Sequence, residues 1–343
     1  MSYYDGTKLL SLLDLNGKQP DIYISTSNRS AGKTTWFSRY FVNRFLKHGE
    51  HFGLIYRYNY ELTDVADKFF SEIRQLFFRD QAMTSKPRAK GLYHELYLNG
   101  KLCGYAFSLN SAEQLKKYSH LFATIKRLLF DEFLSENNKY LPNEIIKFQS
   151  VITSISRGGG EQVRRVPVYL LGNFTSLLNP YYISMGIAAR LNINTNYMKG
   201  NKWVLEQGFY ADVAEKQKES GIMAAFSESK YTRFATEKVY LNDNDVFIER
   251  PEGKSRYLAT VVIDNKNFAI REYPDSGIIY CDTSIDQTFP RRLAFSANEM
   301  DVNYIMLRQN NFFLDNMRSF FEYGCFRFKD LECKKAVFKM LSY

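Results

Sequence analysis

Short apolar runs and stretches of helical hydrophobic spacing follow one another through the first half of the chain. The apolar runs predict buried strands over residues 21–25, 54–56, 125–130 and 166–171. Apolar residues recur at helical spacing over residues 37–48, 62–78 and 142–157. This alternation predicts a three-layer α/β domain with a mainly parallel sheet.

One hairpin is predicted within this domain. Asn99 and Gly100 lie between the apolar stretches 92–98 and 102–107. An Asn-Gly pair between two such stretches favours a two-residue turn.

The second half of the chain has a different pattern. Residues from about 190 to 238 are weakly patterned, which predicts a linker or a small helical subdomain. Consecutive strands are then expected over 246–249, 257–263, 268–272 and 278–281. Ser296 and Glu299 form a capping-box pattern, which predicts a long helix to about Glu322, before Gly324, and a last helix follows over about 330–341. We therefore expect domains over 1–195, 196–238 and 239–343, the last of α+β type.

Composition narrows the class of protein. The chain has 343 residues, of which 45% are hydrophobic and 24% charged, as in soluble globular proteins. These values argue against a disordered chain, a collagen or a disulfide scaffold. Aromatic residues make up 16%, which we assign to the core. Without a membrane-length apolar run or a signal-peptide pattern, an intracellular protein with no membrane partner is expected.

The positive charge is concentrated in one part of the chain. Residues 1–200 carry 26 Lys and Arg against 16 Asp and Glu, and residues 201–343 carry 20 against 21. A basic field of this kind fits a polyanion such as nucleic acid, and it equally fits a solubilising surface. The four cysteines and four histidines show no metal-binding spacing, so no zinc site is expected.

A phosphate-binding loop is predicted between the first strand and the first long helix. Its spacing is that of the pattern GxxxxGK[ST], with Ser27 in place of the first glycine. Backbone N–H groups of such a loop hold phosphate oxygens, while Lys33 neutralises β/γ-phosphate charge and the Thr34 hydroxyl ligates Mg²⁺. The alternative is a turn with an exposed lysine. The residues expected to bind the nucleotide here are Ser27, Asn28, Arg29, Ser30, Ala31, Gly32, Lys33, Thr34 and Thr35.

A pair of acids ends the strand at 125–130. Asp131 and Glu132 are expected at the carboxyl edge of the sheet, where the phosphate loop also lies. Asp131 would hold Mg²⁺ through water, and Glu132 would polarise the attacking water as general base. This pair favours a hydrolysing motor over a nucleotide-binding switch.

Arg157 and Asn173 are further candidates. Arg157 precedes three glycines at a helix end, and it could reach the γ-phosphate of a neighbouring subunit or simply cap the helix. Arg164 and Arg165 are rivals for the first role. Asn173 follows a strand, where it could sense the γ-phosphate or the water, or form an ordinary turn.

The whole set of motifs resembles the DNA-packaging motor ATPases of phi29-like small tailed phages, which are related to large terminases. The residues that carry this resemblance are 28–34, 43–50, 129–133, 140–144 and 171–173, with 246–249 and 280–283 in the second half. It covers nearly the whole chain.

The resemblance implies a P-loop ATPase domain of the ASCE type with a parallel-rich sheet, a linker or lid subdomain and an RNase H-like C-terminal domain. It implies a homomeric ring, expected to be a pentamer, at the portal (connector) of an empty prohead in the host cytoplasm. ATP and Mg²⁺ are the implied cofactors and double-stranded DNA is the implied partner; a structural RNA is left open. The implied roles are phosphate binding for Lys33, Thr34 and the loop arginine Arg29, Mg²⁺ handling for Asp131, catalysis for Glu132 and an arginine finger for Arg157.

Two family positions are less direct in this sequence. A trans-acting lysine falls near Lys116 or Lys117. A DNA-contacting lysine of the family falls on Asn59, and Arg57 is the nearest basic substitute.

The C-terminal domain offers carboxylates that a two-metal nuclease would need to gather. The candidates are Asp243, Asp245, Asp264, Asp275, Asp282 and Asp286, mostly in predicted turns, where Asp is common. An inactive, gripping or docking domain is preferred. The predicted function is a ring ATPase that translocates viral DNA into a capsid. The alternatives are a terminase with an active nuclease and a nucleotide-binding protein without turnover.

Overall fold

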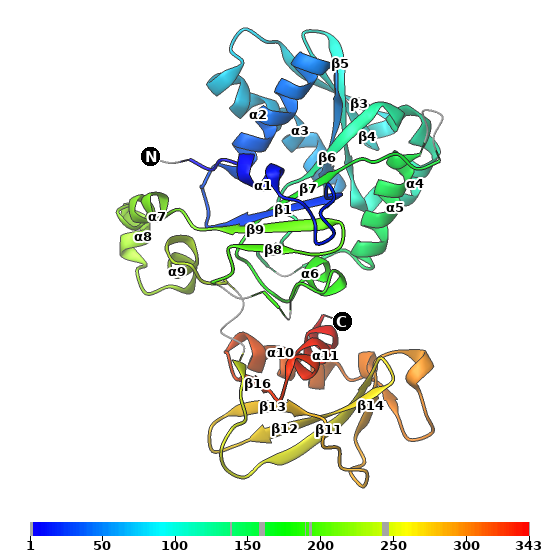
Figure 1. Cartoon of the computed structure of the whole chain (residues 1–343), viewed down its shortest axis with the longest axis vertical. Coiled ribbons are helices and arrows are strands. Elements are labelled where there is room, and N and C mark those ends of the chain that lie inside the picture. Colours follow the sequence, from blue (N-terminus) through cyan, green and yellow to red (C-terminus); the bar gives the residue numbers. More distant parts are fainter. Residues whose placement is uncertain are drawn as a thin grey trace. The chain divides into compact units, whose positions relative to one another are not determined.

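A computed structural model describes residues 3–137, 139–157, 162–188, 190–191, 194–241 and 247–342. For residues 64–69 and 247–248 it describes the backbone alone. The chain divides into two compact units (Figure 1). The first contains residues 1–174 and 194–238, and the second contains residues 175–193 and 239–343.

The first unit is built on a nine-stranded sheet with the order β3-β4-β5-β2-β6-β7-β1-β9-β8. Its strands β1, β2, β5, β6, β7 and β9 are parallel, and β3, β4 and β8 add antiparallel pairs at the two edges. The strand bounds are β1 Ile22–Ser27, β2 His51–Tyr56, β3 Met83–Arg88, β4 Tyr93–Leu98, β5 Lys101–Ser108, β6 Ile125–Phe130, β7 Val168–Asn173, β8 Tyr197–Lys199 and β9 Trp203–Gly208. The predicted parallel-rich sheet and the Asn99-Gly100 hairpin are confirmed.

Helices cover both faces of this sheet (Figure 1). One face packs against α1, α2 and α3 through a cluster that includes Phe37, Phe41 and Phe70. On the other face, Phe148 of α5 packs on Phe130 of β6, with ring centroids 6.2 Å apart. The helix bounds are α1 Thr7–Ser11, α2 Lys33–His48, α3 Asn59–Phe77, α4 Ala112–Leu115, α5 Glu144–Ser156, α7 Ala211–Lys218, α8 Gly221–Ala225 and α9 Lys230–Thr236, with 3₁₀ turns η1 Ala89–Gly91, η2 Leu109–Ser111 and η3 Lys116–Thr124.

Many of the aromatic residues are core residues, as expected, although some, such as Phe226 and Phe312, are exposed. The largest fully buried side chains are all Phe or Tyr, and they include Phe37, Phe52, Phe107 and Phe174 in the first unit. Burying such rings is a large source of hydrophobic stabilisation, of roughly 1.5–3 kcal/mol for each Phe.

The second unit is a seven-stranded sheet with the order β10-β16-β13-β12-β11-β14-β15. Strands β11, β12 and β13 form an antiparallel meander, while β14 and β16 join parallel to β11 and β13. The bounds are α6 Pro180–Ser184, β10 Phe247–Ile248, β11 Arg256–Ile263, β12 Lys266–Tyr273, β13 Ile278–Asp282, β14 Arg292–Ala294, η4 Ala297–Glu299, β15 Ile305–Met306, η5 Leu307–Gln309, α10 Asn311–Glu322, β16 Phe326–Phe328 and α11 Leu331–Leu341. A second, α+β sheet domain at the C-terminus is confirmed.

Two expectations about organisation differ from the structure. Residues 196–238 do not form a separate segment, because β9 pairs with β1 along its whole length and thereby belongs to the large sheet. Helices α7, α8 and α9 follow β9 in the chain. Only residues 211–236, which contain these helices, match the predicted helical subdomain.

The long helix expected from Ser296 is also wrong at its start. The capping box of Ser296 and Glu299 is present, but it opens only the 3₁₀ turn η4. The helix α10 begins later, where the Asn310 side chain accepts a hydrogen bond from the Phe313 N–H. Between them, β15 pairs with β14 and draws the chain into the sheet.

No helix in the described part of the chain is long and apolar enough to cross a membrane.

Candidate nucleotide-binding site

The predicted phosphate loop joins β1 to α2, as the sequence pattern required. Strand β1 ends at Ser27 and α2 begins at Lys33. Ser30 and Gly32 both have left-handed backbone, with φ of 62° and 94°. Such a turn aims successive backbone N–H groups into one concavity, which is the arrangement that binds phosphate oxygens. Thr34 is exposed at the start of α2, and Thr35 follows it half-buried.

Lys33 lies buried at the base of this loop. Its Nζ donates to Ser27 Oγ at 2.5 Å and to Asn173 Oδ1 at 3.3 Å. Strands β1 and β7 are parallel neighbours, and their register places Ser27 opposite Asn173. Burial lowers the pKa of Lys33 to about 8, although the charges of Asp131 and Glu206 oppose that shift. Ser27 therefore does more than replace a glycine, because its hydroxyl helps to hold the lysine.

The two acids after β6 lie at the same edge of the sheet. Asp131 Oδ1 accepts a hydrogen bond from the Glu132 N–H at 2.9 Å. Burial raises the pKa of Asp131 to about 6, and a hydrogen bond from the Thr34 side chain opposes that shift. Thr34 and Asp131, each expected to handle Mg²⁺, are thus neighbours in the structure.

A cavity of about 260 Å³ opens beside these acids. Its lining includes Thr34, Tyr56, Arg57, Asp131 and Glu132. The exposed carboxylate of Glu132 can therefore be reached by a water molecule from this space.

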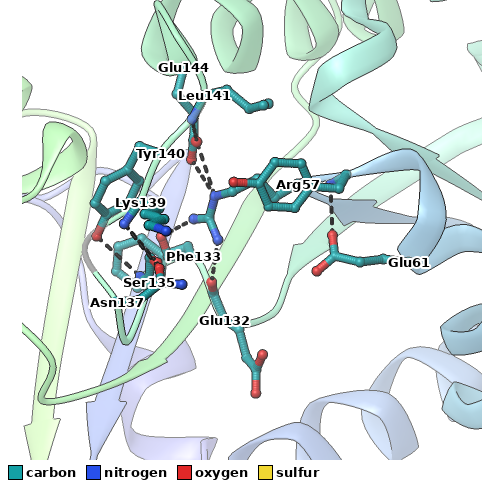
Figure 2. A network of polar contacts seen from close by, with 11 residues as sticks. Arg57, Glu61, Glu132, Phe133, Ser135, Asn137, Lys139, Tyr140, Leu141 and Glu144 are labelled. Atoms are coloured by element: carbon teal, nitrogen blue, oxygen red, sulfur yellow. Dashed lines mark hydrogen bonds and ion pairs between the residues drawn. The ribbon is translucent and has the colours of Figure 1, made fainter.

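The backbone of Glu132 is held in an unusual conformation. Its φ is 52°, in the left-handed region, which is uncommon for a residue other than glycine. Arg57 donates to the Glu132 carbonyl oxygen at 3.3 Å and to the Phe133 carbonyl oxygen at 2.6 Å (Figure 2). A neighbouring guanidinium thus fixes the peptide that carries the carboxylate.

Arg57 is in turn fixed by Glu144, the first residue of α5. The Arg57 Nε lies 3.0 Å and 3.1 Å from the two carboxylate oxygens of Glu144 (Figure 2). Glu144 Oε2 also accepts from the Leu141 N–H at 2.8 Å. Arg57 is 7% exposed and Glu144 is 2% exposed. The interpretation of Arg57 as a DNA contact is therefore corrected, because its guanidinium is buried and committed to internal partners.

Arg29 projects from the tip of the phosphate loop. Its Nη1 contacts Glu136 in an ion pair and donates to Tyr231 Oη at 2.8 Å. Asn28 is fully buried and exchanges two hydrogen bonds with the Tyr210 backbone, at 3.0 Å and 3.2 Å. The phosphate loop is therefore tied to the helical segment that follows β9.

Comparison with known proteins decides the family. The family description "Podovirus DNA encapsidation protein (Gp16)" matches residues 2–342. This chain belongs to that family.

Individual relatives agree with this assignment. The chain is similar to the DNA packaging protein of Bacillus phage phi29, at 24% identity over 316 residues, covering 91% of this chain and 90% of the relative. It is 26% identical to the DNA packaging protein of Bacillus phage B103, covering 91% and 94%. Its fold is similar to a chain of the bacteriophage Phi-29 viral genome packaging motor assembly, with a TM-score of 0.62, 22% identity and coverage of 98% and 99%. The resemblance stated from the motifs is confirmed.

The three candidate finger arginines of this chain differ in their surroundings. Arg164 is buried and donates to the carbonyl oxygens of Ile125 and Ile155. Arg165 forms an exposed ion pair with Asp21 at 3.0 Å. Arg157 is exposed at the C-terminal end of α5. The glycines that follow it lie outside the described residues, which resume at 162.

The candidate nuclease carboxylates of this chain are engaged in separate local contacts where they are described. Asp282 pairs with Arg271 at 2.9 Å, Asp264 pairs with Lys339, and Asp286 accepts from Thr288. Asp275 is exposed in a turn, whereas Asp243 and Asp245 lie outside the described residues. No group of three or more potential metal ligands occurs among the residues that are described.

The structure also shows the surroundings of the two lysine positions that the family resemblance suggested. Lys116 and Lys117 are exposed at the start of η3, which follows β5. Asn59, where the family resemblance placed a lysine, accepts hydrogen bonds from the hydroxyls of Ser108 and Ser111.

Sequence reasoning missed the residues that support the site. Glu144, Glu136 and Tyr231 all act through contacts distant in sequence, with separations of 87, 107 and 202 residues from their arginine partners. The one available signal was Glu144 itself, an acid that follows Pro142-Asn143 at a helix start and is normally only a dipole partner.

Proposed function

We propose that this chain is a motor ATPase that hydrolyses ATP and moves double-stranded viral DNA into a preformed capsid. The observation that carries the proposal is the meeting of Lys33, Asp131 and Glu132 at one sheet edge, where the two acids line a cavity. That arrangement supplies a phosphate cradle, a hard-metal ligand and a base for water. The family supplies the DNA and the capsid as partners.

The residues fit ATP and Mg²⁺. The loop N–H groups and Lys33 would hold the β- and γ-phosphates, and Asn173 would contact the γ-phosphate or the water after releasing Lys33. Thr34 and Asp131 bring oxygen ligands together, and oxygen is what Mg²⁺ prefers. Bound Mg²⁺ would neutralise phosphate charge. Glu132 would accept the proton of the attacking water, with its peptide held by Arg57.

Arg157 is proposed to act on a neighbouring subunit. Helix α5 begins beside Glu132 and runs 13 residues away from it, which is roughly 20 Å. Near its far end, Arg164 donates both to Ile155 of α5 and to Ile125, the first residue of β6, so Arg157 lies toward the sheet edge opposite the phosphate loop of its own chain. A ring of identical subunits, expected to be five, would bring it to the next subunit's γ-phosphate. The domain roles follow the same proposal: ATP hydrolysis in the first unit, and docking or gripping in the second.

For the DNA contacts we propose a type of interaction and not a full set of residues. DNA would be held through its phosphates, independently of sequence, by exposed basic side chains of the first unit, with Lys116 and Lys117 as candidates for DNA or for a neighbour's nucleotide. The further proposed partners are the portal (connector) and the prohead, and a structural RNA is a third candidate. The proposed location is the portal vertex in the host cytoplasm.

Steady-state phosphate release, measured with proheads and DNA and again without them, tests the proposal. We expect Mg²⁺-dependent release that is stimulated by DNA and abolished in Lys33→Ala. Absence of release under every condition would favour the alternative of a nucleotide-binding protein without turnover. Metal-dependent cleavage of plasmid DNA that is lost in Asp264→Ala or Asp282→Ala would favour the terminase-with-nuclease alternative.

A further inference from the structure

The segment before α1 lies against the phosphate loop. The Tyr4 N–H donates a hydrogen bond to the Ala31 carbonyl oxygen at 2.9 Å. The Tyr4 ring is buried and packs on the ring of Trp36 in the first turn of α2, with centroids 6.0 Å apart. Gly6 allows this close approach, because a Cβ added there would lie 2.6 Å from the Trp36 ring. We refer to residues 3–6 as the N-terminal strap.

The hydrogen bond from the strap orients one peptide of the phosphate loop. In a planar trans peptide the C=O and the N–H point in opposite directions. When Tyr4 holds the Ala31 carbonyl oxygen, the Gly32 N–H of the same peptide is turned to the other side, away from the strap. Gly32 is the N-cap of α2, and N–H groups at this point of a phosphate loop bind phosphate oxygens. The strap thus fixes the direction of an N–H group that is assigned to phosphate.

A buried carboxylate on β9 fixes the strap in turn. Glu206 Oε2 accepts a hydrogen bond from Tyr4 Oη at 2.9 Å, and Glu206 Oε1 accepts one from Tyr197 Oη at 3.0 Å. Glu206 is 6% exposed. Burial, together with the Glu206 charge, raises the pKa of the Tyr4 phenol, so the phenol stays protonated and can donate. A buried carboxylate requires such donors, and hydrogen bonds to a charged acceptor are stronger than those to a neutral one.

We propose that Tyr4 and Glu206 are positioning residues for nucleotide binding, which hold the Gly32 peptide in the orientation that the phosphates require. Glu206 fixes the Tyr4 side chain, and the Tyr4 N–H fixes the Ala31 carbonyl oxygen of that peptide. Both residues act through the loop and do not contact the nucleotide. The inference rests on the proposed function, because it requires phosphate at this loop.

The affinity of the full-length protein for Mg²⁺ATPγS tests this role. Tyr4→Phe keeps the ring and removes the hydroxyl that Glu206 holds. A loop that keeps the binding orientation for about a tenth to a third of the time binds about three- to tenfold more weakly, and we expect this loss for Tyr4→Phe. In turnover measurements KM should rise by a similar factor while kcat changes less than about twofold, because the strap acts on the loop and not on the segment that carries Asp131 and Glu132.

Tyr197→Phe is the matched control. It removes the same hydroxyl group from the other oxygen of the Glu206 carboxylate, but Tyr197 lies on β8, outside the strap. Both variants should lose stability in urea unfolding, and only Tyr4→Phe should lose affinity. Equal weakening of binding by the two variants would overturn the proposal, because the buried carboxylate and not the strap would then be responsible. A folded Tyr4→Phe protein with wild-type affinity would overturn it as well.

A double-mutant cycle tests whether Tyr4 acts through Glu206. Glu206→Leu removes the acceptor of the Tyr4 phenol and should weaken ATPγS binding about as much as Tyr4→Phe does. In the Glu206→Leu background, Tyr4→Phe should then cause no further loss of affinity. The same loss in both backgrounds would show that Glu206 does not hold the strap, contrary to the proposal.

Hydrogen exchange followed by NMR reports on the strap in the absence of nucleotide. The amide of residue 4 should exchange slowly in the wild-type protein and in Tyr197→Phe, and faster in Tyr4→Phe. Rapid exchange of this amide in the wild-type protein would contradict the proposal. Failure of the wild-type protein to bind Mg²⁺ATPγS while this amide is protected would instead contradict the proposed function.

Discussion

Glu144→Gln is the sharpest test of how the catalytic carboxylate is held. The substitution keeps the shape of the side chain and an oxygen that can accept from Leu141, but it removes the charge paired with Arg57. Both partners are buried, with side chains 8% and 1% exposed. Removing one partner of such a pair costs about 3–5 kcal/mol, and the retained amide oxygen places this variant at the lower end.

That loss leaves a folded protein, because domains are typically stable by about 5–15 kcal/mol. The functional effect should be larger. Arg57 fixes the peptide of Glu132, whose left-handed backbone needs support. A displacement of about 1 Å in a catalytic group can lower the rate about 100-fold. We therefore expect kcat to fall about 100-fold while nucleotide affinity is nearly unchanged, since Ser27, Lys33 and Asn173 are untouched.

Phosphate release, ATPγS binding and urea unfolding should be measured on Glu144→Gln beside Glu50→Gln. Glu50 also pairs with two arginines, Arg44 and Arg127, but it precedes β2, at the opposite end from Arg57. The control should lose stability and keep its turnover. A folded Glu144→Gln protein with wild-type kcat would refute the reasoning.

Three other outcomes are expected. Glu132→Gln should bind ATPγS normally and lose at least about 100-fold in turnover, as removal of a general base does; unchanged hydrolysis would exclude Glu132 as the base. Mixing Arg157→Ala with Glu132→Gln subunits should restore some hydrolysis at mixed interfaces, and mixed rings without any activity would leave Arg157 as a helix cap. ATP binding should draw a proton onto Lys33, and ATP affinity should fall as pH rises through about 8. Burial lowers the pKa of Lys33 to about 8 before nucleotide binds, whereas bound phosphate favours the charged form of the lysine. Calorimetry of ATP binding in two buffers at pH 8.5 that shows no proton uptake would contradict this.

The sequence predicted the features that depend on neighbouring residues. The strand ending at Ser27, the Gly-Lys-Thr turn and the helix to His48 follow from apolar spacing and from two left-handed glycines, Gly32 and Gly49. The strand before Asp131 is equally local, because six residues suffice to show its apolar character. The positions of these elements were enough to predict most residues of the candidate site.

Features that depend on distant partners could not be predicted in this way. The segment 203–208 has no pattern that reveals its partner, yet it pairs with β1 about 180 positions earlier. Arg57 looked like a surface base because its acidic partner lies 87 positions later. The start of α10 was predicted wrongly because two capping sequences are present, one at Ser296 and one at Asn310. Only the pairing of β15 with β14 shows that the helix begins at the second.

The route of the chain between its two units has a consequence for dissecting the protein. Residues 175–193 group with the second unit, although both flanking segments belong to the first. A fragment ending at residue 238 would keep every strand of the large sheet, but it would leave this stretch without the residues it packs on. Tyr182, which lines a cavity with Phe268 and Phe338 of the second unit, would then lose that apolar cover. An isolated ATPase fragment ending at residue 238 would therefore carry an exposed apolar patch that favours aggregation. A fragment in which a short linker replaces residues 175–193 avoids that patch.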